Sequence, residues 1–298
     1  MKHILITGAS GLLGYNLCRD LIDDYTIFVT KNKTEPPETV AGTVKMDLAG
    51  SLKPLNSWIK QNHIHAIIHC AALSKPALCA ADPKRAYSLN VAASRDLAAI
   101  AQENKSRFVF LSTDLVYNSG TGPHNEADAD PHMVYSQTKF DAEMEVFMVC
   151  PSAIVLRSAL IFGLDNGVHG SFLRENHKDL SEGKFLKLFM DQFRSPIWSR
   201  DIADAIHRIL SLDIISQVFN IGGSTRLSRY DLGIMAAKIF NWDTSKIVPV
   251  QMEGIISDAS YLKDCSLNSS RLERDTGWKA TVLQEALTKV AGEWSTNI

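Results

Sequence analysis

Two stretches of the sequence indicate a reactive site, and one of them is centred on Tyr135 and Lys139. The two side chains are four residues apart, so they can share one side of a helix. A free phenol has a pKa near ~10 and is a poor acid at neutral pH, but a nearby ammonium and a cationic nicotinamide lower that pKa. We therefore predict that Tyr135 protonates a carbonyl oxygen as hydride reaches the carbon, that Thr113 holds that oxygen, and that Lys139 also bonds the nicotinamide ribose. Tyr-x-x-x-Lys is also common on ordinary helices. The pair therefore indicates catalysis only in combination with the second stretch.

The second stretch is a glycine pattern, Gly8-x-x-Gly11-x-x-Gly14, which follows an apolar run at the N-terminus. Glycine permits a tight turn, a close approach of the backbone to a pyrophosphate, and close packing of a helix on a strand. A helix that begins near Leu12 would direct its unpaired N–H groups at phosphate oxygens. A glycine triplet also occurs in purely structural turns, but the strand before it and the helix after it are the context that a dinucleotide site needs. We therefore predict a dinucleotide clamp.

The end of the second predicted strand bears on the choice of cofactor. An acidic residue there would accept a hydrogen bond from the ribose of NAD, and the tip holds none. Thr30, Lys31 and Lys33 could instead hold a 2′-phosphate, so we predict that NADP(H) is favoured over NAD(H). The alternative is a solvated basic loop, since lysines are common on loops. Asp47 and Leu48, after the third strand, either flank the adenine or cap a turn.

These residues depend on an alternation of short apolar segments and helical patterns. We predict strands over residues 4–6, 26–29, 43–46, 66–69, 108–111 and 153–156, and helices over residues 12–22, 82–103 and 135–149. The alternation predicts an α/β protein with a doubly wound parallel sheet that is covered on both faces. Residues 31–42 contain two prolines and no apolar period, which predicts a loop in place of the second crossover helix. We expect residues 1–160 to form the dinucleotide-binding domain and residues 161–298 mainly a small α+β substrate-binding lobe, with some later segments returning to the sheet.

Composition excludes several other classes of protein. The 298 residues carry a net charge of −2, so there is no basic field to attract nucleic acid or a membrane surface. No apolar run is long enough to span a bilayer, and the first strand leaves no room for a signal peptide. Five scattered cysteines without a Cys-x-x-Cys pair favour reduced thiols and a cytoplasmic location. His65 and His69 flank a buried strand rather than a helical metal motif, so we predict no metal site.

The chain resembles the extended short-chain dehydrogenases/reductases, in the branch of dTDP-4-dehydrorhamnose reductase. The resemblance is carried by residues 7–14 (TGASGLLG), 69–72 (HCAA), 89–91 (LNV), 111–117 (LSTDLVY), 135–139 (YSQTK), 156–158 (LRS), 162–163 (FG) and 191–196 (DQFRSP). It implies a Rossmann-type fold with a C-terminal lobe for a nucleotide sugar. It also implies that Thr113, Tyr135 and Lys139 form the catalytic triad.

The same resemblance implies further contacts. The expected cofactor contacts are Gly8, Ser10, Gly11, Leu12, Leu13, Gly14, Cys70, Ala71, Ala72, Asn90, Ser112, Tyr135 and Lys139. The expected substrate contacts are Ser74, Thr113 and Asp114, together with Arg194, which departs from the pattern of the branch.

The sequence also departs from the pattern of the branch. Cys70 stands where many relatives have Asn, and Arg194 replaces an expected Gly. This arginine could hold a phosphate or carboxylate of a different substrate, or form a surface ion pair. A sugar dehydratase of the superfamily needs an Asp-Glu pair after the threonine, and here Asp114 is followed by Leu115. The elimination base is therefore missing.

The expected function is the NAD(P)H-dependent reduction of a nucleotide-linked 4-keto-6-deoxy sugar, with a homodimer as one possible assembly. Another epimerase or reductase of nucleotide sugars is an alternative, although epimerases usually have larger C-terminal lobes. A second alternative is a cofactor-binding regulatory subunit similar to the β subunit of methionine adenosyltransferase, a relative of the branch that binds NADP and serves a partner enzyme.

Overall fold

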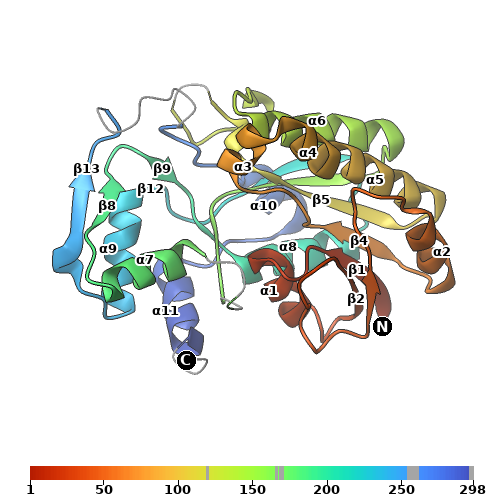
Figure 1. Ribbon diagram of the computed structural model, residues 1–298, viewed down its shortest axis with the longest axis horizontal. Coiled ribbons are helices and arrows are strands. Elements are labelled where there is room, and N and C mark those ends of the chain that lie inside the picture. Colours follow the sequence, from red (N-terminus) through yellow and green to blue (C-terminus); the bar gives the residue numbers. More distant parts are fainter. Residues whose placement is uncertain (119–120, 165–166, 168–170, 254–261, 295–298) are drawn as a thin grey trace.

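The computed structural model describes residues 1–118, 121–164, 167, 171–253 and 262–294. At its centre lies a seven-stranded parallel sheet in the order β11-β6-β5-β4-β1-β2-β3 (Figure 1). The strands are Lys2–Thr7 (β1), Tyr25–Lys31 (β2), Gly42–Lys45 (β3), Ala66–His69 (β4), Arg107–Thr113 (β5), Ile154–Ser158 (β6) and Gln217–Ile221 (β11). The predicted parallel, doubly wound α/β architecture is confirmed.

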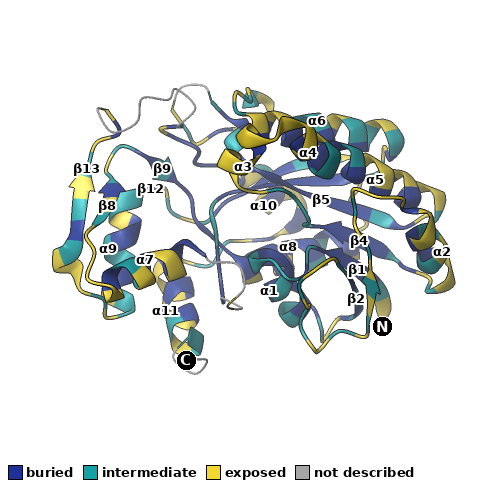
Figure 2. Cartoon of the chain, viewed as in Figure 1, coloured by how far each residue is buried: buried dark blue, intermediate teal, exposed yellow. Residues whose placement is uncertain are grey.

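The strands are apolar throughout because both faces of the sheet are buried. In β1, Ile4 and Ile6 belong to one core and Leu5 belongs to the other. Helices α1, α8 and α10 pack on the first core, and α2, α5 and α6 pack on the second. Figure 2 shows the strands as a buried layer between helices whose outer surfaces are exposed. The helices of this part are Leu12–Asp20 (α1), Lys53–Gln61 (α2), Pro76–Ala81 (α3), Pro83–Tyr87 (α4), Ala93–Glu103 (α5), Val134–Val149 (α6), Ser199–Ser211 (α8) and Ser270–Thr276 (α10).

The strand order creates the crevice in which a ligand can bind. The chain runs outward from β1 to β3 on one side and from β4 to β11 on the other. The loops that follow β1 and β4 therefore diverge at the carboxyl end of the sheet, and open α/β sheets bind ligands at such a point.

Several local predictions differ from the structure in detail. The first helix ends at Asp20, two residues before the predicted end. The long helix predicted over residues 82–103 is interrupted by a π-helical turn at Ser88–Ala92 (η1). The absence of a helix between β2 and β3 is confirmed within these described residues. Helix α3 was not predicted, because six residues are too few to show a helical period.

The remaining elements form a smaller α+β region, seen at the left of Figure 1. It contains Ile161–Phe162 (β7), Leu186–Phe189 (β8), Phe193–Arg194 (β9), Ile197–Trp198 (β10), Leu227–Ser228 (β12), Ile247–Val250 (β13), Phe172–Ser181 (α7), Arg229–Ile239 (α9) and Leu283–Trp294 (α11). Its strands form the pairs β7–β10, β9–β12 and β8–β13. A separate apolar core joins α7, α9 and α11. Single 3-10 turns lie at Asp114–Val116 (η2), Glu126–Asp128 (η3) and Thr244–Lys246 (η4).

Three elements that follow β7 in the chain return to the main sheet. Strand β11 pairs with β6, and α8 and α10 contribute to the core that α1 shares.

No helix in the described part of the chain is long and apolar enough to cross a bilayer.

Candidate active site

The glycine pattern forms the turn between β1 and α1, and two of its members have steric reasons to be glycine. Gly8 has φ +73°, and a Cβ there would lie 2.7 Å from the backbone N of Ala71. A Cβ on Gly14 would collide with the carbonyl of Gly8. Helix α1 begins at Leu12 after Gly11, whose N-cap position supplies no side-chain hydrogen bond. The first-turn N–H groups of α1 can therefore face a phosphate at the crevice.

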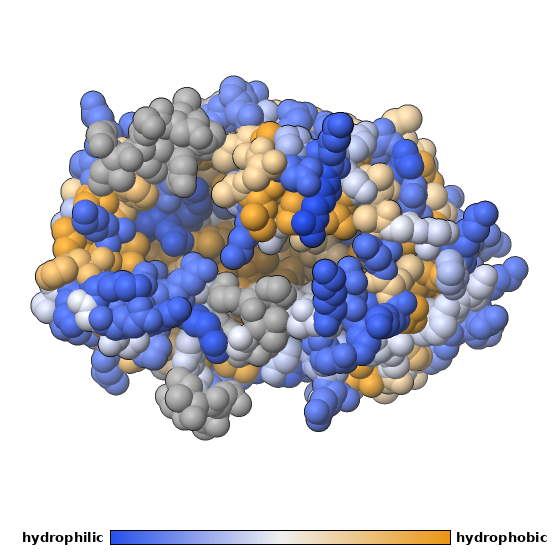
Figure 3. All heavy atoms as spheres, viewed as in Figure 1, coloured by the Kyte–Doolittle hydropathy of each residue, from blue (hydrophilic) through white to orange (hydrophobic). Residues whose placement is uncertain are grey.

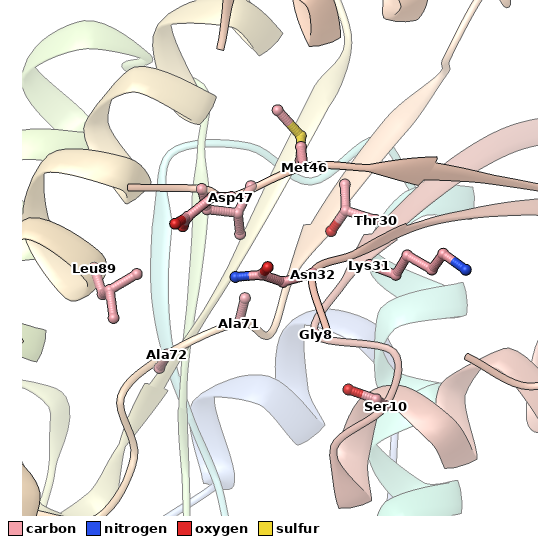
Figure 4. A pocket seen from close by; sticks show the side chains of 11 residues that line it. Gly8, Ser10, Thr30, Lys31, Asn32, Met46, Asp47, Ala71, Ala72 and Leu89 are labelled. Atoms are coloured by element: carbon pink, nitrogen blue, oxygen red, sulfur yellow. The ribbon is translucent and has the colours of Figure 1, made fainter. Parts of the chain in front are cut away.

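A cavity of about 170 Å³ lies beside this turn (Figure 4). It is lined by Gly8, Ser10, Thr30, Lys31, Asn32, Met46, Asp47, Leu48, Ala71, Ala72 and Leu89. Eight of these residues were predicted as cofactor contacts. Asn32, Met46 and Leu89 were not predicted, although Asn32 and Met46 directly follow β2 and β3, where cofactor contacts are expected.

The predicted contacts to a 2′-phosphate are only partly gathered at this cavity. The ammonium of Lys31 lies 2.6 and 2.7 Å from the two carboxylate oxygens of Glu35. Figure 4 shows the Lys31 side chain directed away from the cavity, whereas the Asn32 amide points into it. Lys33 is exposed and is not part of the lining. The Asp47 carboxylate accepts a hydrogen bond from the backbone N of Ala49 at 3.0 Å, so it caps a turn while also lining the cavity.

The three predicted catalytic residues come from two neighbouring elements of the second core. Thr113 is the last residue of β5, and Tyr135 and Lys139 lie on the first two turns of α6. All three are buried, with Lys139 only 2% exposed. The Lys139 ammonium lies 3.9 Å from the centre of the Phe110 ring, within the range of a cation–π contact.

Burial dominates the ionisation of Tyr135 and Lys139. It raises the pKa of Tyr135, an effect that the hydrogen bond with Thr113 opposes and the charge of Asp114 reinforces. The expectation that this pKa is lowered is therefore wrong for this structure, because desolvation of the phenolate outweighs other effects. Burial lowers the pKa of Lys139 to about 7, and the charge of Glu143 opposes this shift. A protonated phenol thus lies one turn from a readily titrated amine.

Asn90 links the loop after β4 to the catalytic helix. Its side-chain oxygen accepts a hydrogen bond from the backbone N of Leu73 at 2.8 Å, and its amide donates to the hydroxyl of Thr138 at 3.1 Å. Thr138 in turn donates to the carbonyl of Tyr135 at 2.8 Å. Asn90 lies within the π-helical turn η1, a kind of irregularity that often marks functional sites. It was predicted as a cofactor contact, but its side chain is used between these two elements.

A second hydrogen-bonded chain passes through His69. The backbone N of Ala71 donates to the Thr7 hydroxyl, and the Ser94 hydroxyl donates to the carbonyl of Asn90. Thr7 must then donate to Nδ1 of His69 (2.6 Å), and Nε2–H must donate to Ser94 (3.0 Å). Burial lowers the pKa of His69 to about 3, so the ring is neutral as this pattern requires.

The predicted substrate contacts are partly brought together near Thr113. Asp114 is buried, with Oδ1 3.3 Å from the Thr113 hydroxyl and Oδ2 3.9 Å from Nε of Arg194. Burial raises the pKa of Asp114 to about 6, and the charge of Arg194 opposes this shift. Arg194 is 9% exposed and also donates to the carbonyl of Phe193 at 2.7 Å, so the expectation of a surface ion pair is wrong. Ser74 is exposed.

A further arginine, Arg229, lies near this group and was not predicted. Burial lowers the pKa of Arg229 to about 10, and the charge of Arg194 adds to the shift. Its guanidinium lies 5.2 Å from the centre of the Phe172 ring. No local motif marks Arg229 in the sequence.

Figure 3 shows that the molecular surface is hollowed near the centre of this view, where apolar residues form the floor.

The other predicted cofactor contacts are not among the residues that line the cavity. Leu13 and Gly14 are buried within α1, and Cys70 follows β4. Burial raises the pKa of the Cys70 thiol. The hydroxyl of Ser112 donates to the carboxylate of Glu143, so it is engaged inside the second core. Among the described residues, no three His, Cys, Asp or Glu side chains gather as metal ligands would.

Two curated proteins are similar in sequence to most of the chain. The chain is 26% identical over 280 residues to methionine adenosyltransferase 2 subunit beta of Danio rerio, covering 91% of this chain and 84% of the relative. It is 24% identical over 297 residues to a probable low-salt glycan biosynthesis reductase of Haloferax volcanii, covering 98% of each.

A solved structure shares the fold. The dTDP-4-dehydrorhamnose reductase of Bacillus anthracis in complex with NADP has a TM-score of 0.84 at 20% identity, covering 98% of this chain and 99% of that one. The family model of the RmlD substrate binding domain matches residues 1–295. Because that match spans nearly the whole chain, the protein belongs to the RmlD substrate binding domain family.

Proposed function

We propose that the protein reduces a nucleotide-linked 4-keto-6-deoxy sugar with NADPH. One observation carries the proposal: Thr113, Tyr135 and Lys139 are buried together at the carboxyl end of the sheet, where the glycine turn also opens. A relative named as a probable reductase, and a reductase of the same fold in complex with NADP, support an oxidoreductase.

The residues of the glycine turn suit a dinucleotide. At Gly8 and Gly14 a Cβ would collide with the backbone. Because glycine has no Cβ, the turn can pack closely and a diphosphate can reach the N–H groups of α1. Ser10, Ala71 and Ala72 line the same cavity and complete the contact. The cofactor supplies the hydride when it is bound.

The side chains of the triad take separate roles in the proposal. The Thr113 hydroxyl holds the carbonyl oxygen of the sugar, and Tyr135 donates a proton from its hydroxyl to that oxygen. A raised pKa keeps Tyr135 protonated until negative charge develops on the substrate. Lys139 holds the nicotinamide ribose and, when charged, stabilises the phenolate that remains.

The preference for NADPH rests on Lys31 at the cofactor cavity. A 2′-phosphate would compete with the Glu35 carboxylate for the Lys31 ammonium, and Thr30 and Asn32 would offer it neutral donors. The NADP complex of the Bacillus anthracis reductase supports the same choice for a protein of the same fold.

The substrate contacts are proposed on the opposite side of the triad. Asp114 and Arg194 approach each other from η2 and β9, beside Thr113. The guanidinium of Arg194 would face the diphosphate or another anionic group of the nucleotide sugar, and Ser74 would approach the sugar from the loop after β4.

The test is oxidation of NADPH and of NADH by purified protein, with enzymatically generated dTDP-4-keto-6-deoxy sugar, monitored by the absorbance of the reduced cofactor. We expect turnover that prefers NADPH and that is lost in Tyr135→Phe. Full turnover in Tyr135→Phe would contradict the proposed proton donor, and tight cofactor binding without turnover would contradict the substrate.

A second candidate function is that of a cofactor-binding regulatory subunit. It is favoured by the relative named methionine adenosyltransferase 2 subunit beta, which matches 91% of this chain. A pull-down with a methionine adenosyltransferase catalytic subunit, combined with absent turnover of keto sugars, would support it. Turnover without association would leave the reductase as the function.

A further inference from the structure

One carboxylate on helix α6 is fully buried. Glu143 is 0% exposed and lies on α6, four residues after Lys139. It accepts a hydrogen bond from the Ser112 hydroxyl. Arg157 donates to it through Nε, 3.1 Å from both oxygens, and through Nη2, 2.6 Å from Oε2. A charge buried this deeply is tolerated only with such a complete set of partners.

The partners of Glu143 lie at one level of the sheet. Ser112 of β5 and Arg157 of β6 are directly paired in the parallel register. The carboxylate therefore reaches from α6 to two adjacent strands at the position just before Thr113. One side chain thus binds the sequence neighbour of Thr113 and lies one turn from Lys139.

Arg157 is itself held firmly on its other side. Its Nη1 donates to the Tyr117 hydroxyl at 3.0 Å and to the carbonyl of Glu126 at 2.7 Å. The Tyr117 hydroxyl donates to the side-chain oxygen of Asn220 in β11 at 2.5 Å. The guanidinium that binds Glu143 is therefore held on its far side by hydrogen bonds to Tyr117 and Glu126.

The charges around Lys139 give Glu143 a second effect. Lys139 faces Glu143 on its own helix, Cys70 after β4 and His69 within β4, with the Phe110 ring below its ammonium. Burial lowers the pKa of Lys139, and the Glu143 carboxylate opposes that shift. The charge of Glu143 therefore favours the ammonium form of Lys139.

We infer that Glu143 is a positioning residue for the proposed reduction, whose carboxylate fixes Thr113 and Lys139 relative to each other by joining α6 to β5 and β6 through Ser112 and Arg157. The inference rests on the proposed function. It also assigns the Ser112 hydroxyl to this connection rather than to the cofactor.

Three variants test the inference. Ser112→Ala removes one hydroxyl donor and leaves the ion pair intact. Ser106→Ala is the matched control, since Ser106 precedes β5 at its opposite end, is buried, and donates to the carbonyl of Ile64 at 2.6 Å. Glu143→Gln keeps the shape of the side chain and removes its charge.

The expected results separate positioning from general stability. Ser112→Ala should lower kcat about tenfold and leave the dissociation constant of NADPH unchanged, because a small misplacement of reacting groups is costly. Ser106→Ala should lower Tm by about as much as Ser112→Ala does, but should leave kcat unchanged. Glu143→Gln should lower kcat about 100-fold and move the limb of the pH profile due to Lys139 to lower pH. If Glu143→Gln fails to fold, Ser112→Ala carries the test.

Two kinetic outcomes would overturn the inference. One is a Ser112→Ala protein that binds NADPH more weakly at unchanged kcat, which would make Ser112 a cofactor contact. The other is a loss of kcat no larger than that of Ser106→Ala at equal loss of Tm.

Hydrogen exchange tests the same inference without substrate. Ser112→Ala should speed the exchange of amides in residues 113–117 and 135–139 together, by about tenfold, whereas Ser106→Ala should not. If the wild-type protein turns over no keto sugar, the proposed function is wrong. Hydrogen exchange then still tests whether Glu143 joins α6 to β5 and β6. Unchanged exchange in residues 135–139 would overturn it.

Discussion

The cofactor side and the proposed catalytic side of the crevice differ in the groups that form them. On the cofactor side, the turn after β1 brings backbone at Gly8, Gly14 and Ala71 so close together that neither glycine has room for a Cβ. The catalytic side consists of long side chains, among them Lys139 and Glu143, that carry charge into the interior. Shape controls the first region and desolvation controls the second. Substitutions in the two regions should therefore fail in different ways.

The largest expected effect is on the catalytic side. Tyr135→Phe should lower kcat by about 1,000-fold, since it removes the proposed proton donor. The affinity for NADPH should stay within about twofold of wild type, because Tyr135 does not line the cofactor cavity. Rapid-mixing kinetics and NADPH fluorescence would measure both, and a parallel loss of affinity would erase the contrast between the two sides.

On the cofactor side, Gly8→Ala should destabilise the fold by about 2 kcal/mol and weaken NADPH binding by about 30-fold. The reason is steric, since the new Cβ meets the Ala71 backbone at a positive φ. Gly292→Ala, in α11, is the matched control, because no atom lies within 4 Å of its Cβ position. Denaturant unfolding and fluorescence titration would report both effects, and equal behaviour of the two variants would refute the steric argument.

Lys139→Met should abolish turnover while stabilising the fold by about 1–2 kcal/mol near neutral pH. Burial lowers the pKa of Lys139 to about 7, so between pH 7 and about 10 the unfolded chain holds a proton that the folded chain lacks. Wild-type stability should therefore rise with pH across this window, and the advantage of Met should shrink. Thermal unfolding from pH 6 to 10 would measure this trend, and a constant difference would speak against it.

The smallest effect concerns the exposed pair of Lys31 and Glu35. Glu35→Gln should raise the preference for NADPH over NADH by about two- to fivefold, because it frees the ammonium from a weak surface ion pair. Lys33→Gln is the control and should change nothing, since Lys33 does not line the cavity. Cofactor titrations at low and high salt would show the effect fading with screening. An unchanged ratio would indicate that Lys31 takes no part in cofactor choice.

Features that depend on the local order of residues could be predicted from the sequence. The alternation of apolar strands and helices predicts the parallel sheet, and the spacing of Gly8, Gly11 and Gly14 predicts the turn after β1. The order of Thr113, Tyr135 and Lys139 along the chain predicts their meeting, because a strand end and the next helix are neighbours in such a sheet.

The directions of individual polar side chains, by contrast, depend on how distant elements pack together. Ser112 binds Glu143, 31 residues away, and Arg194 is buried beside Asp114, 80 residues away. The pKa of Tyr135 rises rather than falls because the surrounding elements remove water from it. Contacts between distant residues and the loss of hydration depend on the packing of whole elements, and neither leaves a periodic trace in the sequence.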